Sequence, residues 1–238
     1  MSKPKAIVLL SGGLDSATCL AIAKAEGFDI HALTFQYGQR HAREVSAAKC
    51  VAENFSVLSH HIISIDHLAL AASSLTGEGE VPKNRTKIAD FNDIPSTYVP
   101  ARNALFLSYA LGMAEVSGTG EIYIGANAVD YSGYPDCRRE FMDAFERMAN
   151  RAIRDAVLGK LIVRIRTPLM NLSKAEIITL GNSLGVPYEL TWSCYDPQGD
   201  LACGECDSCL IRLRGFEEAG LTDPIRYRAK SDAALGSE

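Results

Sequence analysis

The sequence predicts an α/β fold in which helices cover both faces of a single parallel sheet. Short runs of β-branched and apolar residues alternate with longer amphipathic stretches along the chain, a pattern typical of repeated strand–helix–strand units. The 238 residues are 47% hydrophobic and 22% charged, as in an ordinary globular protein, and this length suits one sizeable core better than two full domains. No internal repeat, low-complexity tract or interdomain linker interrupts the sequence.

The first half of the chain predicts three strands separated by two helices. Residues 5–10 form a short apolar run that ends at a Ser-Gly-Gly turn, which indicates a buried strand. The amphipathic stretch at 14–26 is followed by Gly27, and glycine commonly terminates helices. The same periodicities predict a strand at 30–35, a helix at 39–55 and a strand at 57–65.

A long segment without clear periodicity separates the two halves. Residues 73–99 carry Gly77, Gly79, Pro82 and Pro95, and long loops of this kind often close over a binding site. We therefore expect this segment to be a lid. Downstream, the pattern predicts an apolar helix at 101–116, a strand at 121–125, a helix at 138–157 and a strand at 161–166.

Charge and termini limit the partners of the chain. The formal net charge is -5 and the pI about 5.6, so no global positive field favours direct binding of nucleic acid, and a small-molecule substrate is expected. The first apolar run, about six residues long, is too short for a signal peptide or a membrane span. We expect a cytoplasmic protein with no membrane partner, and the sequence leaves a homodimer open.

A Ser-Gly-Gly-Leu-Asp-Ser motif at 11–16 lies where the first predicted strand gives way to the first helix. Helix N-termini at this edge of a parallel sheet present unpaired amides to anions. Glycines let the backbone approach phosphates, and Asp15 can hold Mg²⁺. An ordinary helix cap uses the same residue types, but the strand before it and the helix after it favour ATP binding. The residues assigned to ATP are Leu10, Ser11, Gly12, Gly13, Leu14, Asp15, Ser16, Ala17 and Thr18.

Four of the seven cysteines occupy the pattern Cys194-x8-Cys203-x2-Cys206-x2-Cys209. Four thiolates at this spacing suit a closed, structural Zn²⁺ site. An iron–sulfur cluster and a set of free buried thiols are the alternatives. We expect residues 186–238 to form a loop-rich zinc-binding segment, with little core of its own, packed on a nucleotide-binding domain of residues 1–185.

Several charged residues are further candidates for the site. Arg40 and Arg102 open predicted helices and can pair with phosphate or carboxylate, although solvated arginines are equally expected there. Lys174 lies inside a Ser-x-x-Glu capping box, so its segment has a local role, but its amine can still reach phosphate. Arg212 and Arg214 are expected to be surface charges.

The segment after the fourth predicted strand is the candidate substrate site. Its tyrosines can stack on a purine-like ring, and Asp136 can pair with an amino-pyrimidinone edge. A plain polar loop would have a similar composition, so both interpretations stay open. The residues assigned to substrate are Asn127, Asp130, Tyr131, Tyr134, Asp136 and Arg138.

The Ser-Gly-Gly-x-Asp-Ser motif resembles the PP-loop of the ATP pyrophosphatases, and further motifs narrow the resemblance to the 7-cyano-7-deazaguanine synthase family. The resemblance runs from about residue 6 to about residue 216, with no departure in the loop or the four cysteines. The motifs are Tyr-Gly-Gln-Arg-His at 37–41, Val-Pro-Ala-Arg-Asn at 99–103, Gly-Ala-Asn at 125–127, the segment 130–138, Thr-Pro-Leu at 167–169, Leu-Ser-Lys-Ala-Glu at 172–176 and Leu-Thr-Trp-Ser-Cys-Tyr at 190–195.

This resemblance implies a Rossmann-like, adenine-nucleotide-hydrolase-like fold and a specific reaction. ATP would be cleaved between its α- and β-phosphates to adenylate 7-carboxy-7-deazaguanine. Ammonia would then give the amide, and a second adenylation would give the nitrile of the queuosine pathway, on the free base before any tRNA is involved. The implied cofactors are ATP, Mg²⁺ and Zn²⁺, and the residues assigned to catalysis are Asp15, Ser16, Arg102 and Lys174.

Three other functions account for part of the sequence. A tRNA sulfurtransferase or the ATP domain of an amidotransferase would share the loop, but it should bring an RNA-binding extension or a glutaminase. A zinc-knuckle nucleic-acid module would share the cysteines, but it should have a basic, aromatic surface. A non-catalytic nucleotide-binding regulator remains open.

Overall fold

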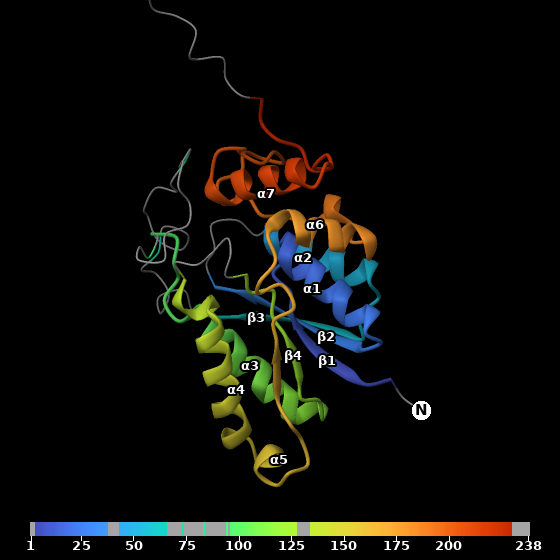
Figure 1. Cartoon of the computed structure of the whole chain (residues 1–238), viewed down its shortest axis with the longest axis vertical. Coiled ribbons are helices and arrows are strands. Elements are labelled where there is room, and N and C mark those ends of the chain that lie inside the picture. The colour runs from blue at the N-terminus through green and yellow to red at the C-terminus, as the bar shows by residue number, and fades with distance from the viewer. Residues whose placement is uncertain are drawn as a thin grey trace, which may run out of the picture.

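A computed structural model of the chain describes residues 3–37, 43–65, 73, 83, 94, 96–127 and 134–229. Within them, five parallel strands form one sheet in the order β3-β2-β1-β4-β5, and helices lie on both of its faces (Figure 1). The α/β fold class predicted from the sequence is therefore confirmed. The strands are β1 (Lys5–Leu9), β2 (Asp29–Gln36), β3 (Ser59–Ser64), β4 (Glu121–Tyr123) and β5 (Arg164–Arg166).

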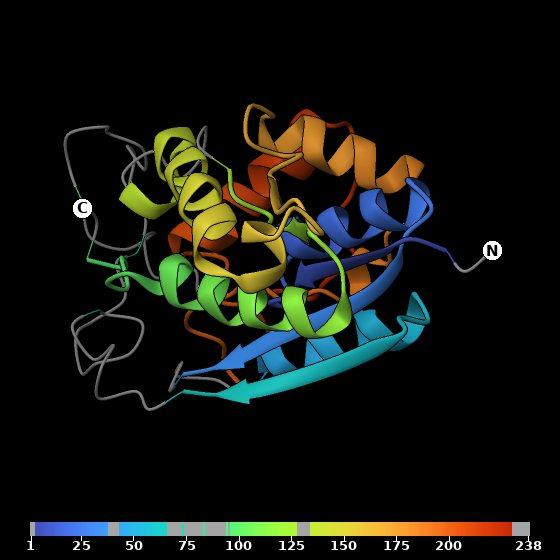
Figure 2. The same cartoon turned by 90° about the horizontal axis from the view of Figure 1, so that it is seen from below.

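Alternating side chains of β1 belong to different cores. Ile7 and Leu9 pack in an apolar cluster with α3 and α4, whereas Ala6 and Val8 pack in a second cluster with α1, α2 and α6, as the two-residue period of a strand requires. Figure 2 shows the sheet between these layers. The helices are α1 (Leu14–Ala25), α2 (Arg43–Asn54), α3 (Arg102–Ser117), α4 (Arg139–Ala152), α5 (Arg154–Val157), α6 (Lys174–Ser183) and α7 (Asp207–Glu218), with short 3₁₀ turns at Pro135–Cys137 and Tyr188–Leu190.

The strand order places a crevice at the carboxyl ends of β1 and β4. The chain leaves β1 toward β2 on one side and returns to β4 on the other, so the direction of winding reverses between these neighbouring strands. Such a switch point is where open α/β sheets bind ligands. In the described part of the chain, no helix is long and apolar enough to cross a membrane.

One predicted helix is broken in the structure. The pattern at 138–157 predicted a continuous helix, but Ile153 is extended, with φ -104° and ψ 145°, and separates α4 from α5. This conformation keeps Ile153 in the core beside α3 and α4 and lets the Asp155 amide donate to Glu115 Oε1. The gain from burying a large apolar side chain thus outweighs helix continuity.

The C-terminal segment contains more regular structure than expected. Residues 207–218 form α7, which packs on α6 and contributes Phe216 to the second cluster. Gly215 lies at this contact, because a Cβ built there would stand 2.4 Å from Lys174 Cγ. The expected segment thus contains one helix, whose Phe216 joins the core of the main sheet, and the division into residues 1–185 and 186–238 stays a prediction.

The surface-charge interpretation of Arg212 is also wrong. Its guanidinium is buried and donates to both carboxylate oxygens of Asp223, at 2.8 and 3.0 Å. It also donates to Thr191 Oγ1 and Tyr188 O, so it joins α7 to the turn before residue 192. Arg214 is exposed, as predicted.

The predicted lid at 73–99 lies largely outside the described residues. Only Ser73, Lys83, Ile94 and residues 96–99 of it are described. Lys83 Nζ lies 2.6 Å from Asp196 Oδ2, so one point of this segment contacts the C-terminal part of the chain. Its role as a lid stays a prediction.

Candidate active site

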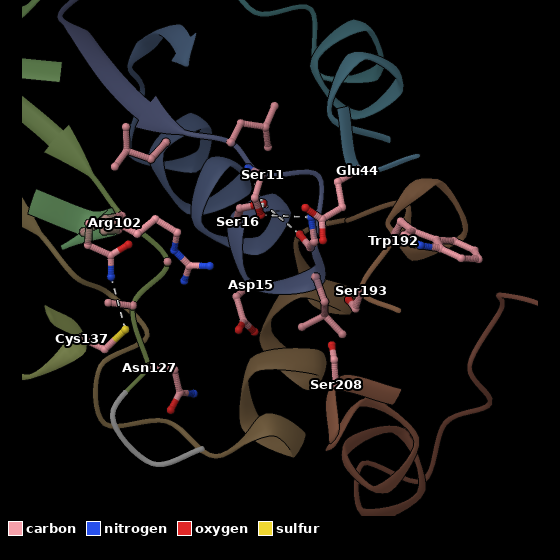
Figure 3. Close-up of a pocket in the computed structure, with 18 of the residues that line it drawn as sticks. Ser11, Asp15, Ser16, Glu44, Arg102, Asn127, Cys137, Trp192, Ser193 and Ser208 are labelled. Atoms are coloured by element: carbon pink, nitrogen blue, oxygen red, sulfur yellow. Dashed lines mark hydrogen bonds between the residues drawn. The ribbon is translucent and has the colours of Figure 1, made fainter. Parts of the chain in front are cut away.

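A cavity of about 240 Å³ opens at the crevice between β1 and β4. Its walls come from the start of α1, from α2, α3 and α6, and from residues 192–195. Figure 3 shows Asp15 between Arg102 on one side and Ser193 and Ser208 on the other. The sequence-predicted loop therefore lies at the ligand-binding edge of the sheet.

Residues 11–16, which we call the nucleotide loop, present the start of α1 to this cavity. Gly13 is the N-cap residue, and no side chain of the described residues caps the helix. Ser16 Oγ instead donates to Gly13 O at 3.0 Å, and Ser11 Oγ accepts from the Gly13 amide at 3.3 Å. The two serines shape the loop itself and leave the first-turn amides for an anion.

Gly12 fixes the position of the nucleotide loop. Its φ is +88°, and a Cβ there would lie 2.3 Å from Glu44 O and 2.6 Å from the Ala48 amide nitrogen. Only glycine fits this left-handed conformation and close approach. On the other side, the Trp192 amide donates to Gly12 O at 2.8 Å. The loop is thus held between α2 and the stretch that leads into Cys194.

Asp15 and Lys174 form an ion pair in the cavity. Lys174 Nζ lies 2.7 Å from Oδ1 and 2.9 Å from Oδ2 of Asp15, and the lysine side chain is only 8% exposed. Lys174 is the first residue of α6, and the capping box of Ser173 and Glu176 predicted from the sequence is confirmed. The cap therefore fixes the point from which the lysine reaches the nucleotide loop.

The remaining ATP candidates differ in position. Arg102 lines the cavity from the first turn of α3, and its Nη1 lies 3.5 Å from Tyr37 Oη. Ala17 and Thr18 are fully buried, and the Thr18 hydroxyl donates to Leu14 O, so neither side chain reaches the cavity. Arg40 lies outside the described residues.

The substrate candidates divide into three groups. Asn127 and Tyr134 line the cavity. Asp136 and Arg138 are not among its described lining residues, and Asp136 Oδ2 accepts from the Asn103 amide at 2.9 Å, at the start of α3. This local partner explains Asp136 without a ligand, and its pairing with substrate stays a prediction. Asp130 and Tyr131 lie outside the described residues.

The cavity also contains residues that the sequence did not single out. Glu44, in the first turn of α2, lines it, and burial raises the pKa of this carboxyl to about 7, although the Arg102 guanidinium acts in the opposite direction. Cys137 lines it as well, and burial, followed by Asp136, raises the pKa of the thiol to about 12. An acidic residue in a first helical turn is expected from the helix dipole alone, so no sequence signal distinguished Glu44.

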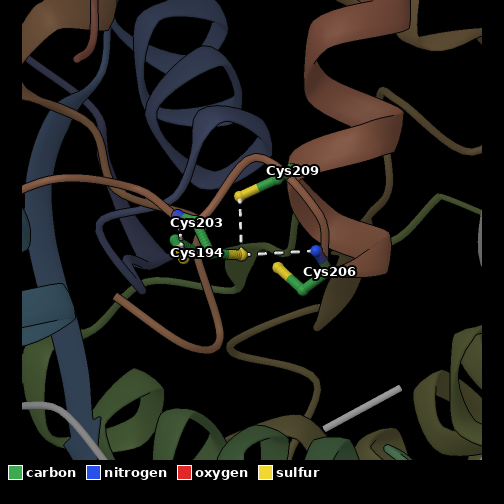
Figure 4. Close-up of side chains that lie close together, drawn as sticks. All are labelled: Cys194, Cys203, Cys206 and Cys209. Atoms are coloured by element: carbon green, nitrogen blue, oxygen red, sulfur yellow. Dashed lines mark hydrogen bonds between the residues drawn. The ribbon is translucent and has the colours of Figure 1, made fainter. Parts of the chain in front are cut away.

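The cysteine cluster, Cys194, Cys203, Cys206 and Cys209, lies beside the cavity (Figure 4). All four side chains are buried, and their sulfur atoms lie within 4.8 Å of one another. The Cys203 amide donates to Cys194 Sγ at 3.2 Å, and the Cys206 amide donates to Cys203 Sγ at 3.3 Å. Hydrogen bonds from Cys194 and Cys209 lower the pKa of Cys206.

Four convergent sulfurs, of which those of Cys194, Cys203 and Cys206 accept backbone hydrogen bonds, fit a tetrahedral metal site, and the all-thiolate set suits Zn²⁺. Cys194 belongs both to the cluster and to the cavity wall. A metal held there would fix the position of residues 192–195.

Comparison with known proteins agrees with these features. The family model described as "Queuosine biosynthesis protein QueC" matches residues 5–220. A protein of Solidesulfovibrio magneticus named 7-cyano-7-deazaguanine synthase is 60% identical over 225 residues, 94% of this chain and 96% of that one. The protein of the same name from Syntrophus aciditrophicus is 59% identical over 223 residues, 93% of this chain and 96% of that one.

Among solved structures, that of NMN synthetase from Francisella tularensis matches with a TM-score of 0.49 and 20% identity, over 92% of this chain and 79% of that one. The family match includes the nucleotide loop and the cysteine cluster, and these two relatives cover 94% and 93% of the chain. The chain belongs to the Queuosine biosynthesis protein QueC family.

Proposed function

We propose that this protein is an ATP-dependent C–N ligase that converts 7-carboxy-7-deazaguanine and ammonia into 7-cyano-7-deazaguanine, the nitrile precursor of queuosine. The names of the curated relatives support the product. The observation that supports the ATP-dependent route is the uncapped start of α1 in the cavity, next to the Asp15–Lys174 pair. Anion-binding amides and a mobile cation are what a bound triphosphate needs.

The first half-reaction activates the carboxylate. A carboxylate is a poor electrophile because its charge is delocalised and its leaving group is poor. Its oxygen attacks the α-phosphorus of ATP, the bond to the β-phosphate oxygen breaks, and pyrophosphate leaves. Ammonia then forms a C–N bond to the acyl carbon as the C–O bond to AMP breaks, and the nitrogen loses one proton, which yields the amide.

The second half-reaction repeats the activation on the amide oxygen. A second ATP adenylates that oxygen and releases pyrophosphate. The nitrogen then loses its two protons while the C–O bond to AMP breaks, and the nitrile remains. No covalent bond to the enzyme is needed. Each nitrile therefore consumes two ATP and releases two AMP.

The residues of the cavity suit these steps. The amides of Leu14, Asp15 and Ser16 hold phosphate oxygens, and Arg102 neutralises phosphate or carboxylate charge from the opposite wall. Asp15 would hold Mg²⁺, which supplies charge neutralisation when it is bound. Lys174, now paired with Asp15, then turns its ammonium to phosphate. The cysteine cluster would hold Zn²⁺ as a structural site that keeps residues 192–195 in the cavity wall.

The decisive experiment mixes the purified protein with the acid, ATP and an ammonium salt. The expected result is 7-cyano-7-deazaguanine by mass spectrometry, with AMP and pyrophosphate released only when the acid is present. AMP release without the acid would contradict the assignment of this acid as the substrate. Nucleotide binding without any AMP would support a non-catalytic regulator instead.

A further inference from the structure

The carboxylate of Glu44 lines the active-site cavity and has no hydrogen-bond partner among the described residues. Glu44 is the second residue of α2 and lines the cavity opposite the nucleotide loop. Figure 3 shows its side chain extending from α2 toward Ser11 and Ser16. Its backbone oxygen faces Gly12, so the helix start that carries it is fixed against the loop.

Nothing in the described part of the chain forms a hydrogen bond to this carboxylate. Its neighbour Arg43 is engaged elsewhere, because the guanidinium lies 3.9 Å from the centre of the Trp192 ring and 2.5 Å from Asp200 Oδ1. The groups that act electrostatically on Glu44 or respond to it are Arg102, from α3, and Tyr37, at the end of β2. Partial burial of a carboxylate that lacks hydrogen bonds is costly, and such residues are concentrated at functional sites.

The proposed reaction leaves one requirement unassigned, which is the removal of protons from nitrogen. Ammonia exists mostly as ammonium at neutral pH, so the nitrogen must lose one proton before it can attack and a second one as the neutral amide forms. The amide nitrogen loses two more protons when the nitrile forms. The nitrogen is the same atom in both half-reactions, so one base beside it can serve both.

Among the described residues of the cavity, Glu44 is the only group suited to this task. Arg102 and Lys174 are cations and cannot accept a proton, and Asp15 is held by Lys174. Burial raises the pKa of Tyr37, Tyr134 and Cys137, which keeps them protonated. The lining contains no histidine, and its two carboxylates are Asp15 and Glu44.

We propose that Glu44 is the general base that takes the protons from the nitrogen nucleophile, so that the ammonium ion is the species that enters the cavity. This inference rests on the proposed function. The Glu44 carboxylate accepts a proton from ammonium, and the freed lone pair forms the C–N bond as the C–O bond to AMP breaks. Glu44 returns each proton to water before it accepts the next. The later protons are the one that the nitrogen loses as the amide forms and the two that it loses as the nitrile forms. A base that ionises near neutral pH suits this cycle.

Glu44→Gln with two nucleophiles tests the assignment. With ammonium, nitrile and amide formation should fall by about 100-fold or more. Hydroxylamine is already unprotonated at neutral pH and needs no base, so the variant should still convert the adenylate to the hydroxamate at close to the wild-type rate. Raising the pH supplies free ammonia, so the deficit with ammonium should shrink as pH increases. Glu53→Gln, at an exposed position of the same helix, is the matched control and should change neither rate.

The outcomes separate the two proposals. Equal losses with ammonium and hydroxylamine would mean that Glu44 supports adenylation or folding, and they would overturn its role as base. Wild-type rates with both nucleophiles would overturn it as well. If the wild-type protein itself forms neither hydroxamate nor AMP in the presence of the acid, the proposed function fails, whatever Glu44 does.

Discussion

The nucleotide loop and the cysteine cluster share one cavity wall, but different interactions hold them in place. The loop follows Leu10 and contains Leu14. Both are nearly inaccessible members of a large apolar cluster that extends over one face of the sheet. Apart from the cysteines, the buried residues around the cluster in the described part of the chain are Ala47, Trp192 and Ala202, with Tyr195, Ile225 and Tyr227 packed against them. Apolar burial therefore positions the loop, whereas the metal proposed to bind the four sulfurs would hold the cluster together.

The loop is therefore the region proposed to act on ATP, whereas the cluster is the region proposed to hold part of the cavity wall in place. The loop keeps its amides available because packing, and not a ligand, gives it shape. Residues 192–195 stay in place through the Trp192–Gly12 hydrogen bond on one side and the sulfurs on the other. Changes in the cluster should thus cost stability and metal first, and changes at the loop should cost turnover first.

The largest expected effect is at the cluster. Cys206→Ser removes one of four ligands, and we expect zinc content and the free energy of unfolding to fall together, the latter by more than about 4 kcal/mol. Elemental analysis and thermal denaturation measure both. Cys50→Ser, at an exposed cysteine of α2, is the matched control. An unchanged zinc content in the Cys206 variant would refute the metal site.

At the loop, Asp15→Asn should reduce acid-dependent AMP release on the order of 10³-fold, because it weakens the ligand proposed to hold Mg²⁺ beside the phosphates. Zinc content should not change, which would separate the two regions cleanly. Asp143→Asn, at an exposed position of α4, should be neutral. Turnover near the wild-type level would remove Asp15 from the proposed mechanism.

The pH dependence of the free energy of unfolding provides a further test at Glu44. Its pKa is raised from 4.5 to about 7 in the folded chain, so the folded state holds a proton that the unfolded state has lost, and stability falls as pH rises through that window. Glu44→Gln cannot ionise and should be more stable than wild type by up to about 3 kcal/mol above pH 7. Urea denaturation should show the gain vanish toward pH 4.5. A constant difference across this range would contradict the shift.

The smallest effect is expected at the helix cap beneath Lys174. Ser173→Ala deletes one half of the capping box and should cost about 1 kcal/mol. Because the Asp15 ion pair still holds the lysine, AMP release should change little. A large loss of activity, measured beside the same urea curves, would show that the cap itself orients the ammonium.

Most of the fold followed from periodicity, because strands of a parallel sheet are continuous apolar runs. The predicted and observed ends of β1 and of α1 differ by one residue. The break at Ile153 could not be predicted, since helical periodicity continues through it and only the tertiary contact with α3 decides the backbone. The helix α7 was not predicted, because its first turn contains Cys209 and was interpreted as part of the cysteine motif.

The site was predictable where its residues are adjacent in sequence. The loop at 11–16 and the four cysteines each form a short local motif that can be recognised from the sequence. The pairing of Lys174 with Asp15 joins residues 159 positions apart, and no local pattern encodes it. Arg212 was misjudged for the same reason, since its partner Asp223 lies in a segment without periodicity.

The contact at Gly215 restricts which residues can replace this glycine, in evolution or by engineering. Replacing a mid-helix glycine by alanine ordinarily stabilises a helix by about 1 kcal/mol. Here the added methyl group would enter the space of the Lys174 stem and push its ammonium away from Asp15. Gly215→Ala, which helix propensity alone would favour, would therefore weaken the ion pair in the cavity.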